Sequence, residues 1–180
     1  KWLEWAGLSA VGANAVEGLV RLCAFLAYLA LISLLSDIQR VLAYHGAEHM
    51  VVAAHDRDEP LTIHSARLHS TAHPRCGTAF LLTVILLSII VFMLVPRDPF
   101  WLVISSRILL IPVIAGISYE FIRYAGRHPD NIFVGLLVSP SLLLQKLTTR
   151  NPDNSQIEVA LEALKEAVRI DEGTADLESI

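Results

Sequence analysis

The chain has 180 residues and a net charge of −4, and apolar residues make up 54% of it, above the roughly 45–50% usual in soluble domains. No basic tract suits nucleic-acid binding, and two cysteines do not make a disulfide framework. The length fits one domain, and a chain that begins at Lys1 is expected to be a fragment. Because the apolar residues cluster in runs, we expect an all-α, membrane-embedded protein.

The first apolar run covers residues 19–35 and reads LVRLCAFLAYLALISLL. Its length is at the low end for a helix that spans a bilayer, and Arg21 near its start can reach the interface. Trp2 and Trp5 suit a membrane interface, although two aromatic residues on an ordinary helix explain them equally well. We expect this run to be membrane-spanning or embedded; the alternative is a helix buried in a large core.

A polar stretch over residues 36–78 follows, and six of the seven histidines lie between residues 45 and 73. Residues 37–55 predict a helix that ends at a charged turn with a proline. Residues 62–72 predict a second short helix with Thr62 as its N-cap. A solvated loop does not need six histidines, so their clustering indicates a functional site.

The polar stretch contains two motifs, Tyr44-His45-Gly46-Ala47-Glu48-His49 and His73-Pro74-Arg75-Cys76-Gly77. On a helix, His45, Glu48 and His49 fall within an arc of about 100°. Imidazole with thiolate or carboxylate favours zinc over magnesium or calcium, which prefer oxygen ligands. We therefore expect a Zn²⁺ site with its ligands among His45, Glu48, His49, His73 and Cys76.

The His-x-x-Glu-His pattern has two interpretations. In the first, both histidines bind zinc, Glu48 is a catalytic general base, and the third ligand is His73, Cys76 or Glu120. Glu120 is also a candidate for the catalytic base. In the second, the motif residues close the shell and the zinc is structural. A histidine-rich polar helix that binds no metal remains the simplest alternative.

Other polar residues have ordinary explanations beside functional ones. Glu120 is either functional or a helix-end charge paired with Arg123 or Arg75. His69 is a reserve ligand because it lies four residues before His73. The remaining histidines are expected to face solvent or to be hydrogen-bonded, namely His55, His64 and His128.

Two further apolar runs, over residues 79–95 and 101–124, flank a tight turn at residues 96–99 and predict a hairpin. The first of these runs has no charge, whereas the second contains Arg107, which is costly in an apolar environment unless it is paired. A fourth run over residues 132–147 is short and interrupted by Ser139-Pro140-Ser141, so we expect an interfacial or re-entrant segment.

The C-terminal part reads as a soluble helix after a linker at residues 148–155. Ser155 and Glu158 have the spacing of a capping box, and the helix carries one apolar stripe made of Ile157, Leu161, Leu164 and Val168. Residues 171–180 are expected to be disordered. The chain thus divides into a membrane-embedded domain with the metal motif, 1–150, and a C-terminal helix and tail, 151–180.

The positions of the basic residues predict the orientation in a cell membrane. Four arginines lie in the polar stretch 36–78, and only Arg97 lies in the turn between the second and third runs. At the end of the third run and in the segment after it lie four more basic residues, namely Arg123, Arg127, Lys146 and Arg150. Basic residues favour the cytoplasmic side, so we expect the metal motif and the C-terminus to lie there.

Four segments are similar to a known family: YHGAEH, HPRCGT, LIPVIAGISYEFIR and LLLQKLTTRNPDNSQIEVA. Over about residues 12–170, the chain resembles the YqhQ-like bacterial membrane protein family, whose function is unknown and which carries the label of predicted metal-dependent enzyme. The resemblance implies that the family motif falls on His45, Glu48, His49, His73, Arg75, Cys76 and Glu120. The family usually has a further N-terminal glycine-rich stretch, which this chain lacks.

These observations support three functional hypotheses. The first is a membrane-embedded zinc hydrolase that acts on a lipid, peptide or isoprenoid-linked substrate. The second is a non-enzymatic homo-oligomer, a pore or half-channel, with a structural zinc site. The third is a scaffold that binds other membrane proteins through the C-terminal helix. In all three the lipid bilayer is a partner and nucleic acid is not.

Overall fold

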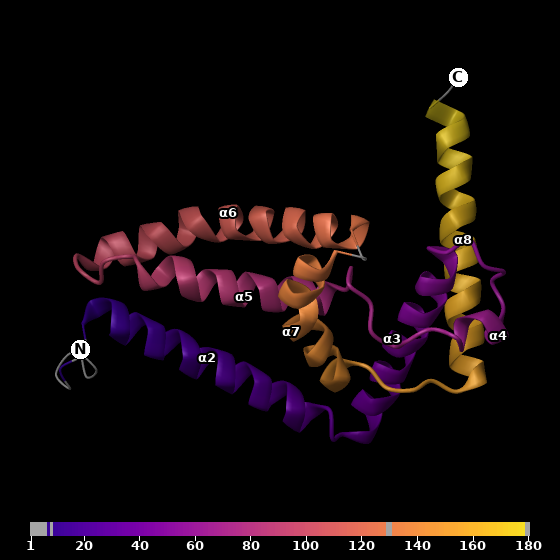
Figure 1. The fold of residues 1–180 in the computed structure, drawn as a ribbon, viewed down its shortest axis with the longest axis horizontal. Helices are drawn as coiled ribbons and strands as arrows, with labels where there is room; N and C mark the ends of the chain where they lie inside the picture. Colours follow the sequence, from indigo (N-terminus) through magenta and orange to yellow (C-terminus); the bar gives the residue numbers. More distant parts are fainter. Residues whose placement is uncertain (1–6, 8, 129–130, 179–180) are drawn as a thin grey trace. The chain divides into compact units, whose positions relative to one another are not determined.

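The computed structural model describes residue 7, residues 9–128 and residues 131–178 (Figure 1). All regular secondary structure among these residues is helical, which confirms the all-α prediction. The main helices are α2 (Ala10–Ile32), α3 (Ser36–His55), α4 (Ile63–Ala66), α5 (Gly77–Met93), α6 (Phe100–Arg127), α7 (Ile132–Thr148) and α8 (Asn154–Glu178). The interface prediction for Trp2 and Trp5 falls outside the described residues.

The chain forms two compact units. The hairpin unit comprises Lys1–Leu31 and Pro74–Ser141, and the histidine unit comprises Ile32–His73 and Leu142–Ile180. The C-terminal helix is thus grouped with the polar stretch. The separation of a membrane-embedded domain, 1–150, from a soluble segment, 151–180, stays a prediction.

In the hairpin unit, α5 and α6 pack side by side, which confirms the predicted hairpin (Figure 1). Helix α2 also contacts α5, because the Asn14 amide donates hydrogen bonds to the carbonyls of Phe92 (3.2 Å) and Val95 (3.1 Å). Gly18 allows this approach: a Cβ at Gly18 would lie 2.8 Å from the Ile89 side chain. Helix α2 begins nine residues before the predicted apolar run. Its first turns therefore include polar residues such as Asn14, which contacts the end of α5.

By length and composition, α2 and α6 can each cross a membrane. Of the 18 most apolar consecutive residues, 0% are buried in α2 and 6% are buried in α6. Helices α5 and α7 are apolar but shorter. The apolar side chains of α6 are therefore largely uncovered by protein, for example Trp101, Ile108 and Leu109 at 67%, 68% and 68% exposure.

Helix α7 continues through Pro140, so Ser139-Pro140-Ser141 interrupts the apolar run without ending the helix. The interfacial or re-entrant placement of this segment stays a prediction. A proline inside a helix leaves the carbonyl four residues earlier without its amide donor. Here the Ser139 hydroxyl donates a hydrogen bond to that carbonyl, Leu136 O, at 2.8 Å. A side chain thus replaces the missing backbone donor, and the helix tolerates the proline.

In the histidine unit, α3 packs against α8 and α4. The hydrophobic core of this unit consists of Ala47, Met50, Val51, Ala66, Ile157 and Leu161. The predicted apolar stripe of the C-terminal helix therefore packs against α3. Gly46 lies where the chain after α7 crosses α3, and a Cβ there would lie 2.2 Å from the Arg150 carbonyl oxygen.

The prediction for the second short helix is wrong in its extent but right in its N-cap. The second short helix is Ile63–Ala66 instead of 62–72, although Thr62 is its N-cap and accepts a hydrogen bond from Ser65 N at 3.2 Å. Beyond the helix, backbone groups bond distant side chains: Thr71 O accepts from His49, and His73 N–H donates to Gln145. These tertiary contacts replace helical hydrogen bonds, so the segment is not a helix.

The C-terminal helix differs from expectation at both ends. Its reciprocal cap is Asp153 with Gln156, rather than Ser155 with Glu158: Gln156 N–H donates to Asp153 Oδ1, and Asp153 N–H donates to Gln156 Oε1, both at 2.9 Å. At the other end α8 runs to Glu178, so the prediction of disorder after residue 170 is wrong for the described part of the tail.

Candidate metal centre

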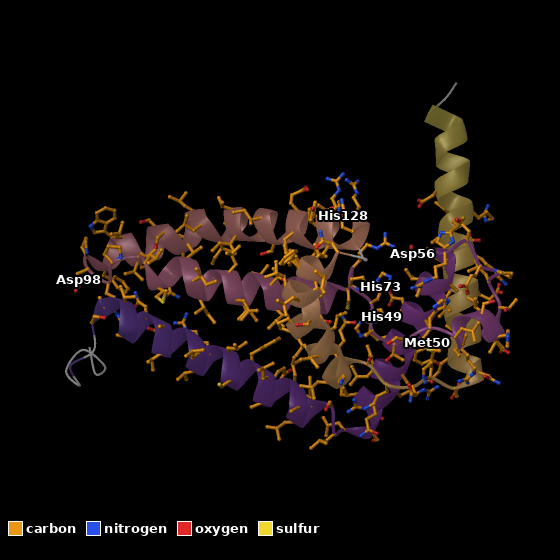
Figure 2. All side chains as sticks on the ribbon, viewed as in Figure 1. His49, Met50, Asp56, His73, Asp98 and His128 are labelled. Carbon is orange, nitrogen blue, oxygen red and sulfur yellow. The ribbon has the colours of Figure 1, made fainter. Side chains whose placement is uncertain are left out.

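Three imidazoles gather in the histidine unit. Helix α3 places His45 and His49 one turn apart on the same side, and their ring centroids are 4.3 Å apart. The ring of His73, from the segment after α4, lies 5.9 Å from that of His49 (Figure 2). His49 and His73 are buried, at 5% and 8% exposure, so two of the three rings are shielded from bulk water.

Hydrogen bonds fix the tautomers of the two α3 histidines. His45 Nδ1 lies 2.7 Å from the Thr148 carbonyl oxygen, and His49 Nδ1 lies 2.6 Å from the Thr71 carbonyl oxygen. A carbonyl oxygen only accepts, so each Nδ1 carries the proton and donates it. In each neutral ring the lone pair, through which an imidazole binds a metal, is then on Nε2.

In His73 the other ring nitrogen, Nε2, makes the hydrogen bond. Its Nε2 lies 3.1 Å from Asp56 Oδ2, so Nε2–H donates to the carboxylate and Nδ1 carries the lone pair. The backbone of His73 is also fixed, since its N–H donates to Gln145 Oε1 (2.7 Å) and its carbonyl accepts from Gln145 Nε2 (2.9 Å). Gln145 is fully buried, so the third imidazole is placed by a rigid contact from α7.

The other predicted site residues have the following surroundings within their own units. Glu48 is exposed and lines an open groove between α3 and α8 together with Tyr44 and Val159. Cys76 belongs to the hairpin unit, where it is the buried N-cap of α5 and its Sγ accepts a hydrogen bond from Thr78 N at 3.4 Å. Glu120 lies on α6 of the hairpin unit and bonds Arg123 at 3.3 Å.

Asp56 is the site residue that the sequence analysis missed. The residue was assigned to a charged turn, but it caps α3 with helical backbone angles (φ −61°, ψ −16°). At i+7 from His49 and i+11 from His45 it falls on the same helix face. That spacing was the available signal.

The reserve ligand and the other histidines have separate surroundings. His69 Nε2 lies 2.9 Å from Glu59 Oε2, so its ring is engaged by a carboxylate. His128 Nδ1 donates to the Tyr124 carbonyl at 3.0 Å and its ring stacks on Tyr124. His55 and His64 are exposed. The histidine cluster is therefore formed by His45, His49 and His73.

The donor set suits a transition metal. A metal-binding imidazole normally donates its second N–H to a carbonyl or carboxylate, which orients the ring and fixes the tautomer. All three rings already have such a partner: Thr148 O, Thr71 O and Asp56. Nitrogen donors of this kind could hold zinc and do not suit magnesium or calcium.

These features define a helical protein with apolar, membrane-length helices and a buried histidine cluster. The chain matches the model of the family described as "Protein of unknown function (DUF1385)" over residues 3–170, and it belongs to this family. It is 40% identical over 157 residues to the uncharacterized protein YqhQ of Bacillus subtilis (strain 168), covering 87% of this chain and 49% of that protein. The chain thus spans about half the length of the curated relative it matches. No solved structure matches it.

Proposed function

We propose that this protein is a membrane protein that binds zinc through His45, His49 and His73. The observation that carries the proposal is the common arrangement of the three rings: each has one nitrogen within hydrogen-bond distance of an oxygen acceptor, as metal-binding imidazoles usually do, and the rings lie close together. Zinc would tie the segment that ends in His73 to helix α3. Its charge would also stabilise a buried cluster of neutral imidazoles.

The fourth ligand would decide between two functions. Three imidazoles with one open position are typical of catalytic zinc sites, which favours a zinc-dependent hydrolase. Cys76 follows His73 by three residues, a spacing that favours a closed, structural shell if the thiolate binds. The placement of Glu48 in the α3–α8 groove also favours the structural function, because the predicted base is then not among the imidazoles.

The membrane part of the proposal rests on the hairpin unit. Helices α2 and α6 have the length and composition of membrane spans, and large apolar side chains of α6 are exposed. A bilayer would cover them. The distribution of the basic residues favours the cytoplasmic side for the histidine unit and the C-terminus. The predicted homo-oligomer and the binding of other membrane proteins through α8 stay predictions.

Metal analysis of the purified full chain tests this proposal. Elemental analysis and X-ray absorption at the zinc edge would be applied to the wild type, to His49→Ala and to His55→Ala. His55 is the matched control, since it is an exposed histidine at the end of the same helix. We expect about one zinc per chain in the wild type and in His55→Ala, and little in His49→Ala.

The absorption spectrum then separates the two functions. One sulfur at about 2.3 Å, lost in Cys76→Ser, would establish the closed shell, whereas only nitrogen and oxygen at about 2.0–2.1 Å would leave a position for substrate. Hydrolase screening is justified in the second case. Absence of zinc in the wild type, or equal zinc in His49→Ala, would overturn the proposal.

A further inference from the structure

A polar cluster lies between apolar helices of the hairpin unit, far along the chain from the histidines. Glu17 of α2 forms ion pairs with Arg21 and, at 3.0 Å, with Arg97 of the turn after α5. Asn14, one turn before Glu17, is bonded to carbonyls at the end of α5. The carboxylate is thus shared by two guanidinium groups, and the amide is fully engaged in holding α2 against α5.

Arg107 of α6 lies against an aromatic ring instead of a carboxylate. Its guanidinium lies over the Phe92 ring, 5.4 Å from the centroid, and the side chain is half-buried. Within the described part of the chain, no carboxylate pairs with Arg107 and no group accepts a hydrogen bond from it. A cation on an apolar helix normally pairs or marks a functional site. An aromatic face compensates only part of its charge.

Two cavities meet at Arg107. One has a volume of about 250 Å³ and is polar, and its lining includes Arg97, Asp98, Ser106 and Arg107. The other has a volume of about 330 Å³ and is mainly apolar, and its lining includes Val84, Ile85, Ile89 and Ile111. Asn14, Glu17, Phe92 and Arg107 line both cavities. Asp98 marks the turn at the polar end (Figure 2).

The charges around the two cavities do not cancel. Arg21, Arg97 and Arg107 contribute three positive charges, and Glu17 and Asp98 contribute two negative charges. The cavity lining therefore has a net charge of +1, and a ligand with one negative charge would balance it. A polar cavity that continues into an apolar one fits a molecule with an anionic head and a hydrocarbon chain.

We propose that the hairpin unit binds an anionic phospholipid, with the phosphodiester at Arg107 and an acyl chain along Ile85, Ile89 and Ile111. The phosphodiester has the single negative charge that the lining lacks, and a guanidinium binds phosphate oxygens through two parallel hydrogen bonds. The proposal uses the membrane placement of the hairpin unit, which would bring such lipids within reach. It does not use the metal centre.

Lipid binding by the full chain in detergent micelles tests this site. Phosphatidylglycerol, phosphatidylcholine and inorganic phosphate would be titrated separately, with affinity measured by native mass spectrometry or calorimetry. We expect phosphatidylglycerol to bind at least tenfold more tightly than phosphatidylcholine. Tight binding of inorganic phosphate without lipid preference would instead show a site for a free anion and overturn the lipid assignment.

Two variants examine the head and the chain of the ligand. Arg107→Met keeps an unbranched apolar stem but removes the guanidinium and its charge, and it is expected to weaken phosphatidylglycerol binding about tenfold or more. Arg123→Met is the matched control, since Arg123 lies on the same helix and is paired with Glu120. Ser88→Phe would fill the apolar cavity, which Ser88 lines, and should weaken both lipids without changing the preference between them.

The outcomes separate this inference from the proposed function. If Arg107→Met binds phosphatidylglycerol as the wild type does, the site is wrong, whatever the zinc content. Zinc content should be equal in wild type and Arg107→Met, and circular dichroism should show the same helix content. Equal weakening in Arg107→Met and Arg123→Met would indicate general charge attraction to lipid and would also overturn the proposal.

Discussion

The two units bury their side chains in different ways. Helix α3 of the histidine unit has eight buried residues, mostly small, whereas α5 has only Ala79 and Leu82, and α6 has four. The longer α6 therefore has fewer buried residues than α3, although it is more apolar. Helix α3 is therefore stabilised by its protein neighbours. The exposed apolar side chains of α5 and α6 would be stabilised by an apolar environment outside the described chain, such as a bilayer.

The same contrast holds for polar groups. In the histidine unit, imidazoles are bonded to backbone carbonyls and to Asp56, as is usual for buried polar groups. In the hairpin unit, Arg107 has an aromatic ring as its described partner and faces cavities. The polar groups of the histidine unit are therefore bonded within the chain, whereas the proposed membrane and lipid contacts would supply partners to the hairpin unit.

The largest effect is expected from a methyl group added inside the histidine unit. In Gly46→Ala the new Cβ would lie 2.2 Å from the Arg150 carbonyl oxygen and 3.2 Å from Thr71 Cγ2. The backbone after α7 must then move, and we expect a loss of about 3 kcal/mol or more in the free energy of unfolding. Thermal unfolding of the purified protein in detergent measures it.

The matched control is the same change in the hairpin unit. A Cβ at Gly116, in the middle of α6, meets no atom within 4 Å. Gly116→Ala should therefore leave stability unchanged or raise it by up to about 1 kcal/mol, because alanine favours the helix. Similar destabilisation by both substitutions would contradict the contrast between the units.

A charge on the exposed face of α6 tests whether that face meets lipid. Ile108 is 68% exposed, and Ile108→Asp would place a carboxylate in the hydrocarbon region at a cost of about 3 kcal/mol. We expect a clear decrease in the carbonate-resistant membrane fraction. Ile170→Asp, on the 51% exposed Ile170 of α8, should change nothing. If Ile108→Asp inserts like the wild type, that face does not lie in the bilayer.

The helices of this fold could be predicted where apolar runs and periodicity determine them. The polar helix of the first motif and the hairpin followed directly from sequence. The failures lie where one side chain overrides a local rule. The Ser139 hydroxyl compensates for Pro140, and Asp153 with Gln156 forms the cap instead of the neighbouring Ser155 with Glu158. Such alternatives differ by single hydrogen bonds, which spacing alone does not rank.

Only the part of the site that lies on one helix could be predicted from the spacing of residues in the sequence. His45 and His49 share a face because they are four residues apart. Glu48 was placed within the same arc, but it is about 100° from His49 and faces the α3–α8 groove. Gln145, which positions His73, is 72 residues away along the chain. No local pattern links a buried glutamine to a histidine at that separation.

An intermediate effect is expected at Asp56, the carboxylate that orients His73. Asp56→Asn removes the charge that accepts the Nε2–H bond and should weaken zinc binding 10- to 100-fold, which is about 1.4–2.7 kcal/mol. Competition with a zinc chelator measures the change. Asp58→Asn is the control: Asp58 lies two residues further on with φ 54°, a conformation that asparagine also adopts. Equal affinities for the two variants would remove Asp56 from the site.

The smallest effect concerns the cap of α8. Hydrogen bonds from the Ser155 side chain and the Gln156 backbone lower the pKa of Asp153 below its ordinary value. Because the folded-state pKa is the lower one, the stabilisation is present above the unfolded pKa of about 3.9 and is lost as pH falls through the folded-state pKa. Asp153→Ala removes the cap and should therefore lower stability at pH 7, and it should make stability fall less steeply as the pH is lowered.

The control for this cap is the residue that the sequence pattern favoured. Glu158→Gln leaves the bonds between Asp153 and Gln156 intact and should change stability at pH 7 by less than about 0.5 kcal/mol. Urea unfolding at pH 7 and at pH 3 would compare the two variants. A larger loss in Glu158→Gln than in Asp153→Ala would show that α8 is capped two residues later. The contact of its apolar stripe with α3 would then begin from a different first turn.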